Sequence, residues 1–225
     1  MVEKIKYLLL FFINLFPILS FSQPNNINGL SLWLKADYGV TYDSNYKVSE
    51  WHDASDNNYI FIQNDINKQP VFIDYNTNMN ELPSLKFNSS ILYSTNSIKI
   101  STIFVLADYD YNTFLDYSGL FTRSWAWDSW YDFLIDSNSG GTMMVSPQLM
   151  NGNFYINNTK TIDFSPLPIP KIIYGLLIYQ VEWNDIILGN DRSIPGRNWI
   201  GDVYEIIVYD RILDSIEIEQ VKTYL

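Results

Sequence analysis

The stretch "GDVYEIIVYDRILDSIEIEQVKTYL", residues 201 to 225, predicts a β-strand, a turn and a short helix. Its first part is rich in β-branched and aromatic residues, which are typical of strands. Successive side chains of a strand point to opposite faces. The two faces would be Tyr204, Ile206 and Val208 on one side and Val203, Glu205, Ile207 and Tyr209 on the other. Because both faces are largely apolar, we expect this strand to lie in the middle of a sheet.

The residues after the turn carry the signals of a helix. Asp214 stands in the N-cap position and Glu217 follows three places later, which is the spacing of a capping box. Ile218, Val221 and Leu225 then form an apolar stripe along one helix face. We expect this helix to pack against the sheet.

Glu205 is the one carboxylate in the middle of the predicted strand, and it raises the question of catalysis. Retaining glycosidases need two carboxyl groups about 5 to 5.5 Å apart, and on one strand such a pair would be two residues apart. Glu205 has no carboxylate at that spacing. We therefore expect Glu205 to be structural, accepting hydrogen bonds from loop backbone or pairing with an arginine.

Short strand-like runs continue through the rest of the chain, separated by Asn, Asp, Gly, Ser and Pro. Almost nothing before Asp214 has the pattern of a helix. The runs are "LSLWLKA", "YIFIQ", "PVFIDY", "SLKF", "ISTIFVLADY", "YDFLI", "GTMMV", "NFYIN", "KIIYGLLIYQVEW", "DIILG" and "DVYEIIVYD". Many short strands at such spacing in one domain predict an all-β sandwich or barrel.

Residues 1–22 have the parts of a secretory signal peptide. Lys4 and Lys6 precede an apolar run over residues 7–21, and we expect cleavage before Gln23. The alternative is an uncleaved membrane anchor, but the run is shorter than the roughly 20 apolar residues that a spanning helix needs. These features predict a secreted protein, extracellular or periplasmic.

The mature domain, residues 23–225, is expected to be distinctly acidic. The chain of 225 residues has a formal net charge of −11. A surface of that sign repels phosphate backbones and anionic lipid heads. This argues against nucleic acid and, after signal cleavage, against membranes as partners, whereas neutral and cationic ligands stay open.

The chain contains no cysteine and one histidine. These counts exclude disulfides, cysteine nucleophiles and thiolate metal sites, and a Ser-His-Asp mechanism would depend on His52 alone. We expect His52, in "EWHDASD", to be an exposed loop residue. In "ADYDYNTFLDYS", a solvated strand end or loop would explain Asp108, Asp110 and Asp116 without a ligand.

The segment "RSWAWDSWYDF", residues 123–133, suggests a ligand site rich in aromatic residues. If the segment is extended, no single face takes all the aromatic rings, so some are exposed or the segment is a loop. Exposed rings can stack on sugars while polar neighbours orient the hydroxyls. The candidate residues are Trp125, Trp127, Asp128, Trp130 and Tyr131. The alternative is that Trp125 or Trp127 packs inward.

The segment "DASDNN" raises the question of a metal. Asp53, Ser55 and Asn57 have the opening spacing of a calcium loop, and oxygen ligands suit that ion. The rest of the pattern is missing, since Asn58 stands where the sharp-turn glycine would be and Asn64 where the bidentate glutamate would be. A turn held by hydrogen bonds between side chains and backbone is the favoured interpretation, with calcium as the alternative and no other cofactor expected.

Several segments occur in the order seen in one known family. They are "LSLWLKADYGV", "WHDASDNN", "LPSLKFN", "NFYINNTKTI" and the closing stretch with its Gly-Asp, central Glu and Tyr-Asp-Arg. Together they resemble the laminin G-like, concanavalin A-like jelly-roll domains of secreted Bacteroidetes proteins. The resemblance covers most of residues 30–225 and implies an antiparallel β-sandwich of the jelly-roll type, ending in a short helix.

What the resemblance implies about function is binding, chiefly of glycans or of other proteins. The leading hypothesis is a non-catalytic module that binds an extracellular glycan. The second is a protein-protein adhesion or structural module, in which the exposed aromatics form a protein interface. The third is a glycan-active hydrolase or lyase, because the same jelly roll also carries such enzymes.

Overall fold

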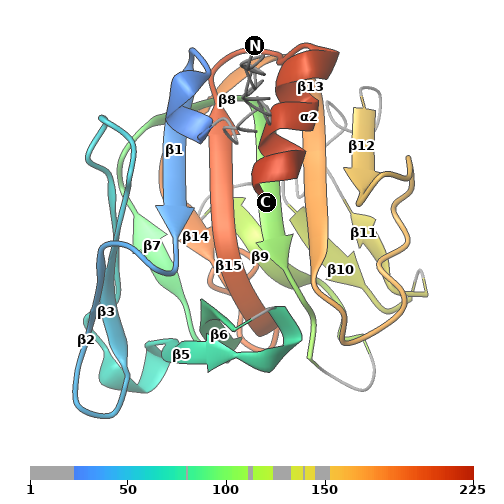
Figure 1. Ribbon diagram of the computed structural model, residues 1–225. Coiled ribbons are helices and arrows are strands. Elements are labelled where there is room, and N and C mark those ends of the chain that lie inside the picture. Colours follow the sequence, from blue (N-terminus) through green and yellow to red (C-terminus); the bar gives the residue numbers. More distant parts are fainter. Residues whose placement is uncertain (1–22, 80, 111–113, 124–132, 139, 145–152) are drawn as a thin grey trace, which may run out of the picture.

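Two antiparallel sheets form the body of the part of the chain that the structure describes (Figure 1). A computed structural model describes residues 23–79, 81–110, 114–123, 133–138, 140–144 and 153–225. The predicted signal peptide, residues 1–22, lies outside these ranges. Within them, a sheet of seven strands and a sheet of eight strands are formed.

The strand order shows that neighbours in space are often distant in sequence. The seven-stranded sheet has the order β12 (Asn153–Ile156), β13 (Lys171–Trp183), β8 (Ile98–Ala107), β15 (Ile200–Tyr209), β6 (Leu82–Asn88) and β5 (Val71–Asn76), with β1 (Leu30–Lys35) paired to β15. The eight-stranded sheet has the order β11 (Thr142–Met144), β10 (Phe133–Asp136), β9 (Ser118–Arg123), β14 (Ile186–Leu188), β7 (Leu92–Ser94), β4 (Ile60–Ile62), β3 (Val48–His52) and β2 (Val40–Tyr42). The short 3₁₀ helices are η1 (Pro24–Asn26), η2 (Ile66–Lys68) and η3 (Thr77–Met79).

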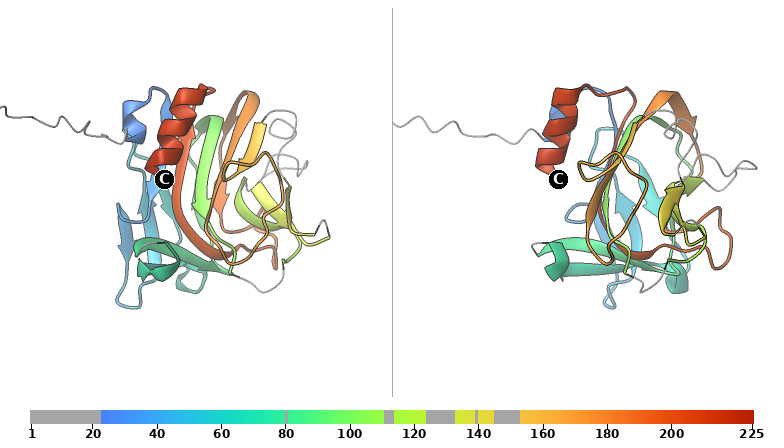
Figure 2. Two further views of the ribbon diagram at one scale, coloured as in Figure 1. Left: turned by 45° about the vertical axis from the view of Figure 1, so that its right-hand side comes forward. Right: turned by 90° about the vertical axis from the view of Figure 1, so that its right-hand side faces the viewer.

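The two sheets pack face to face around one apolar core (Figure 2). Val105 and Ile206 enter this core from the seven-stranded sheet, while Trp51, Phe61 and Phe121 enter it from the other sheet. All five side chains are fully buried. The structure therefore confirms the predicted antiparallel β-sandwich.

Strand β15 lies in the middle of its sheet, as its two apolar faces predicted. It pairs with β8 along one side, and with β6 and then β1 along the other. The predicted faces are wrong at one point, because Val203 pairs with Ala107 and Glu205 with Leu106, which leaves Tyr204 as an extra residue. This β-bulge reverses the alternation. Val203 therefore joins Ile206 in the core.

Helix α2 (Ser215–Tyr224) covers the outer face of the seven-stranded sheet, as Figure 2 shows. The predicted capping box is confirmed, because the Asp214 carboxylate accepts hydrogen bonds from the backbone of Ile216 and Glu217, and the Glu217 side chain accepts one from the backbone of Asp214. The predicted apolar stripe packs against the sheet, with Val221 buried beside Ile207.

The cap supports a first prediction. Asp214→Ala removes the carboxylate oxygen that accepts both backbone hydrogen bonds of the first helical turn, so we expect the free energy of unfolding to fall by about 1 kcal/mol. Urea denaturation of the purified protein measures this change. Ser215→Ala is the control, since Ser215 is exposed and lies just inside the helix. Equal stability of the Asp214→Ala variant and the parent would contradict a stabilising cap.

The sequence analysis did not predict four strands, β2, β3, β7 and β9. Because β3 was missed, His52 was expected in a loop, whereas it is the last residue of this strand and is only partly exposed. Its ring Nε2 lies 2.8 Å from Glu50 Oε2. The expectation of an exposed loop histidine is therefore wrong.

In the described part of the chain, no helix is both long and apolar enough to cross a membrane.

Candidate functional site

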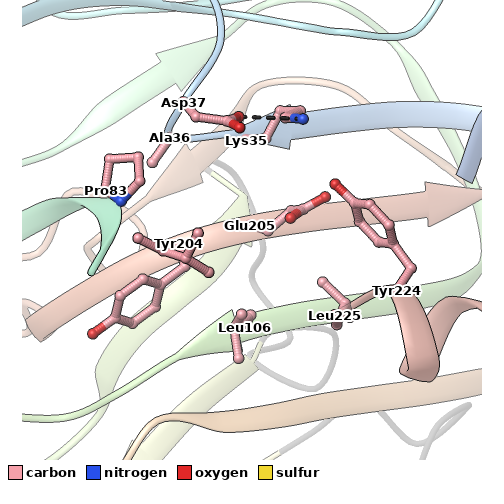
Figure 3. Close-up of a pocket in the computed structure, with 10 residues that line it drawn as sticks. Lys35, Ala36, Asp37, Pro83, Leu106, Tyr204, Glu205, Tyr224 and Leu225 are labelled. Carbon is pink, nitrogen blue, oxygen red and sulfur yellow. Dashed lines mark ion pairs between the residues drawn. The ribbon is translucent and has the colours of Figure 1, made fainter. Parts of the chain in front are cut away.

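A groove beside the end of β1 is the strongest candidate site. It consists of two adjoining hollows. The first, here called the helix-end hollow, has a volume of about 200 Å³ and lies beside the end of α2 (Figure 3). It is lined by Lys35, Ala36, Asp37, Leu82, Pro83, Leu106, Tyr204, Glu205, Tyr224 and Leu225.

The second part of the groove, here called the tyrosine hollow, has a volume of about 300 Å³. It is lined by Ala36, Asp37, Tyr38, Gly39, Val40, Tyr42, Phe72, Asp74 and Pro83. Ala36, Asp37 and Pro83 line both hollows, so the hollows adjoin at the end of β1. Small-molecule sites commonly have volumes of about 300 to 1,000 Å³, and the two hollows together reach that range.

Glu205 lies in the helix-end hollow because of the bulge at Tyr204. Its Oε1 accepts a hydrogen bond from the Trp33 indole nitrogen, and the Tyr224 hydroxyl forms a second hydrogen bond with the carboxyl group. Figure 3 shows Glu205 and Tyr224 pointing toward each other. The expected partners, loop backbone or an arginine, are therefore wrong.

The surroundings of Glu205 disfavour its charged form. Burial raises the pKa of Glu205 to about 7, although the hydrogen bonds from Trp33 and Tyr224 act in the opposite direction. Lys35, which lies nearby, also lowers the pKa, and Asp37 raises it. At neutral pH this carboxyl group is therefore present in both protonation states.

Aromatic rings line the tyrosine hollow, and they differ in how well they are packed. Tyr42 is stacked between Phe72 and Tyr46, with ring centroids 4.6 Å and 5.8 Å away. Tyr38 is 53% exposed, and its ring contacts no other aromatic ring among the described residues. Tyr38 is therefore an open aromatic surface on the wall of the groove.

Two aspartates stand beside these rings. Asp37 is exposed and forms an ion pair with Lys35, with 3.3 Å between Nζ and Oδ1. Asp74 lies on β5 and is exposed. Its carboxylate forms no hydrogen bond or ion pair with another residue that the structure describes. The groove thus combines an open ring with carboxylate oxygens that can accept hydrogen bonds.

A buried polar network lies beyond the helix-end hollow and corrects the expectation for Asp108. That residue is 1% exposed rather than solvated. Its carboxylate accepts hydrogen bonds from the Asp202 backbone at 2.8 Å and the Tyr204 hydroxyl at 3.2 Å, and burial raises its pKa to about 6. Asp110 and Asp116 are exposed, as expected. The network anchors Tyr204, whose side chain lines the groove.

The residues proposed for calcium form a hydrogen-bonded turn. Asp53 Oδ1 accepts hydrogen bonds from the backbone of Trp33 and Ser55, and Oδ2 accepts one from the Ser55 hydroxyl. Asn57 donates to the carbonyl of Ser31. Asn58 has a φ of 58°, a backbone conformation that glycine adopts without strain. The predicted turn is thus present, and it ties the loop to β1.

Two sets of residues that the sequence suggested as ligand sites stay predictions. Within the described ranges, no group of three His, Asp or Glu side chains is placed to hold a metal ion, and calcium at Asp53, Ser55 and Asn57 stays a prediction. The aromatic candidates lie outside the described residues and also stay predictions; they are Trp125, Trp127, Asp128, Trp130 and Tyr131.

The sequence analysis missed the residues of the tyrosine hollow. A signal was present in "KADYGVTYDSNY", residues 35–46, where tyrosine and aspartate alternate with few large aliphatic residues. Such a segment has little to bury, so its rings stay at the surface. Asp74 lies about thirty residues further along the chain, and only the pairing of β5 into the sheet brings it to the groove.

Comparisons with known proteins found no relative: no family model, no curated protein and no solved structure matches the chain. The laminin G-like resemblance therefore rests on the motifs quoted above and stays a prediction.

Proposed function

We propose that the protein is a secreted, non-catalytic module that binds an extracellular glycan in the groove. The observation that carries this proposal is Tyr38, a half-exposed ring without an aromatic partner in the described structure, on the wall of a hollow that also presents Asp37 and Asp74. A concave site that combines an exposed aromatic ring with a few polar side chains is typical of small-ligand binding.

The chemistry of the groove suits a sugar. A sugar ring has an apolar face, which can lie against an aromatic surface, and hydroxyl groups around its edge that need hydrogen-bond partners. Tyr38 offers the surface, and the carboxylates of Asp37 and Asp74 offer acceptors. The tyrosine hollow has room for a sugar ring, and the helix-end hollow would take a neighbouring one.

The geometry around Glu205 supports binding rather than hydrolysis. The Trp33 indole and the Tyr224 hydroxyl both hydrogen-bond to the carboxyl group, so two of its hydrogen-bonding positions are occupied within the protein. Asp37, the other acid in the same hollow, is paired with Lys35. Glycoside hydrolysis needs an acid and a second carboxylate that are both available to the substrate.

A matched pair of tyrosines tests the proposal. Tyr38→Ala should weaken glycan binding at least about tenfold, since stacking on one ring contributes a large part of the affinity of a small sugar site. Tyr179 is also 53% exposed but lies on β13, far along the sheet from the groove. Tyr179→Ala should therefore leave glycan binding unchanged.

The measurement is a glycan array on the purified protein, followed by calorimetric titration of the best ligand. Both variants should melt within a few degrees of the parent, because neither ring is in the core. Equal loss of affinity in the two variants would contradict a site at Tyr38. Release of shorter sugars during the titration would instead support the hydrolase or lyase hypothesis.

A protein-protein adhesion module is the second candidate, and one surface favours it. Ile178 and Tyr179 are exposed at a register shift in β13, and Gln180 next to them donates a hydrogen bond to the Asp210 carbonyl. Ile212 and Ile216 follow Asp210 in the chain and are 52% and 70% exposed. Absence of glycan binding together with protein binding that Tyr179→Ala removes would favour this candidate.

A further inference from the structure

The charges around the groove restrict the kind of glycan that it suits. The side chains that line the two hollows include the acids Asp37, Asp74 and Glu205 and one cation, Lys35. Lys35 is already paired with Asp37. The chain as a whole has a net charge of −11. A uronic acid or a sulfated sugar would therefore meet charges of its own sign in the groove.

The tyrosine hollow presents an open carboxylate close to open aromatic surface. Asp74 forms no side-chain bond with the residues that the structure describes, and it lines the same hollow as Tyr38 and Tyr42. An ammonium group is attracted both by a carboxylate and by the negative face of an aromatic ring. A neutral hydroxyl gains only the hydrogen bond.

We infer that the groove binds glycans that carry free amino groups, such as glucosamine residues, in preference to neutral, N-acetylated or acidic glycans. In this arrangement the sugar ring lies on Tyr38 and its ammonium group lies against Asp74. The inference rests on the proposed function and adds the chemical class of the ligand.

Four oligosaccharides of equal length provide the test: β-1,4-linked hexamers of glucosamine, N-acetylglucosamine and glucose, and a hexamer of galacturonic acid. Each is titrated calorimetrically into the full chain at pH 5.5 and low salt, where the amines carry a proton. We expect the glucosamine hexamer to bind about tenfold tighter than the glucose and N-acetylglucosamine hexamers. The galacturonic acid hexamer should bind most weakly, and added salt should reduce the preference for glucosamine.

Two variants test whether Asp74 causes the preference for the glucosamine hexamer. Asp74→Asn should bring the affinity for the glucosamine hexamer close to that for the glucose hexamer, because the amide oxygen can still accept a hydrogen bond but the charge that attracts the ammonium is lost. Asp56→Asn removes the same charge from an exposed residue that does not line the groove, and it should keep the preference. A lysine hexamer should bind more weakly than the glucosamine hexamer, because it offers no sugar ring to Tyr38.

The outcomes separate this inference from the proposed function. Four results would overturn the inference and leave a glycan-binding groove. They are binding of the glucose or N-acetylglucosamine hexamer as tight as that of the glucosamine hexamer, tighter binding of galacturonic acid, a preference that survives Asp74→Asn, and equal binding of the lysine hexamer. Absence of binding to all four sugars, with no hit on the glycan array, would overturn both.

Discussion

Replacement of Asp191 by alanine is expected to lower the free energy of unfolding by about 3–5 kcal/mol, the range typical for breaking a buried ion pair from one side. The Asp191 side chain is completely buried between two arginines. Arg192 binds it with two nitrogens, at 2.6 and 3.0 Å, and Arg197 with one, at 2.7 Å. The variant would leave both guanidinium groups without this carboxylate.

The same carboxylate holds a loop in an unusual conformation. Arg192 and Ser193 have φ angles of 53° and 60°, in the left-handed region that is unfavourable for most residues. Backbone hydrogen bonds of Asp191 with Arg197 and with Ile194 complete the turn. Loss of the side chain therefore removes the ion pairs and the restraint on these two strained residues together, which places the expected loss at the upper end for a single substitution.

Urea denaturation of the Asp191→Ala protein measures the effect, and Asp191→Asn and Asp56→Ala are the comparisons. Asp191→Asn keeps one acceptor and should lie between the parent and Asp191→Ala. Asp56 is exposed in a turn, so Asp56→Ala should change stability by less than about 1 kcal/mol. A loss this small for Asp191→Ala would show that the arginines are satisfied without it.

The sequence predicted the fold well, because its signals are local and repeated. The alternation in β15 and the capping box at Asp214 each depend on residues within a few places of one another. The face of Tyr204 could not be predicted, because it depends on a bulge at the point where β15 exchanges β6 for β1 as its neighbour. That exchange depends on how distant strands pair.

The burial of two aspartates, Asp108 and Asp191, could not be predicted from the sequence either. "ADYDY" and "NDRSIPGRN" have the composition of solvated loops, yet Asp108 and Asp191 are fully buried. Asp108 is covered because β15 brings Asp202 and Tyr204 alongside it. A carboxylate is buried only where partners are supplied. The partners of Asp108 lie about ninety residues further along the chain. A local sequence pattern therefore cannot predict its burial.

The candidate site could also be predicted only where its residues are close in the sequence. Tyr38 and Asp37 could have been found as a cluster of exposed rings and acids following one strand. Glu205 was singled out correctly as unusual, but its partners Trp33 and Tyr224 come from β1 and the end of α2. The groove exists only where these elements and the β5–β6 pair meet.

Glu205→Gln is expected to stabilise the protein at alkaline pH, by an amount that grows as the pH rises. Burial raises the pKa of Glu205 from the usual 4.5 to about 7, so the folded state favours the protonated acid. The stability that this group contributes is fully present below pH 4.5 and is lost as the pH rises through about 7. The loss between pH 4 and pH 8 is on the order of 3 kcal/mol.

Glutamine is a good replacement because it resembles the protonated acid in shape and charge. Its amide oxygen can accept the hydrogen bond from Trp33, and its amide nitrogen can donate to the Tyr224 hydroxyl. The remaining charges near this position, Lys35 and Asp37, are unchanged. The variant should therefore match the parent near pH 4 and exceed its free energy of unfolding by on the order of 3 kcal/mol at pH 8.

The difference between variant and parent is the quantity to measure, because Asp108 also titrates in this range. Its pKa of about 6 makes both proteins less stable as the pH rises from 4 to 6, and this shared change cancels in the difference. Urea denaturation at intervals of one pH unit from 4 to 8 gives the curve. Glu219→Gln, at an exposed acid of α2 paired with Lys222, should show no change of this size. A difference for Glu205→Gln that stays constant with pH, or that falls toward pH 8, would mean that the hydrogen bonds from Trp33 and Tyr224 outweigh burial and keep the carboxylate charged.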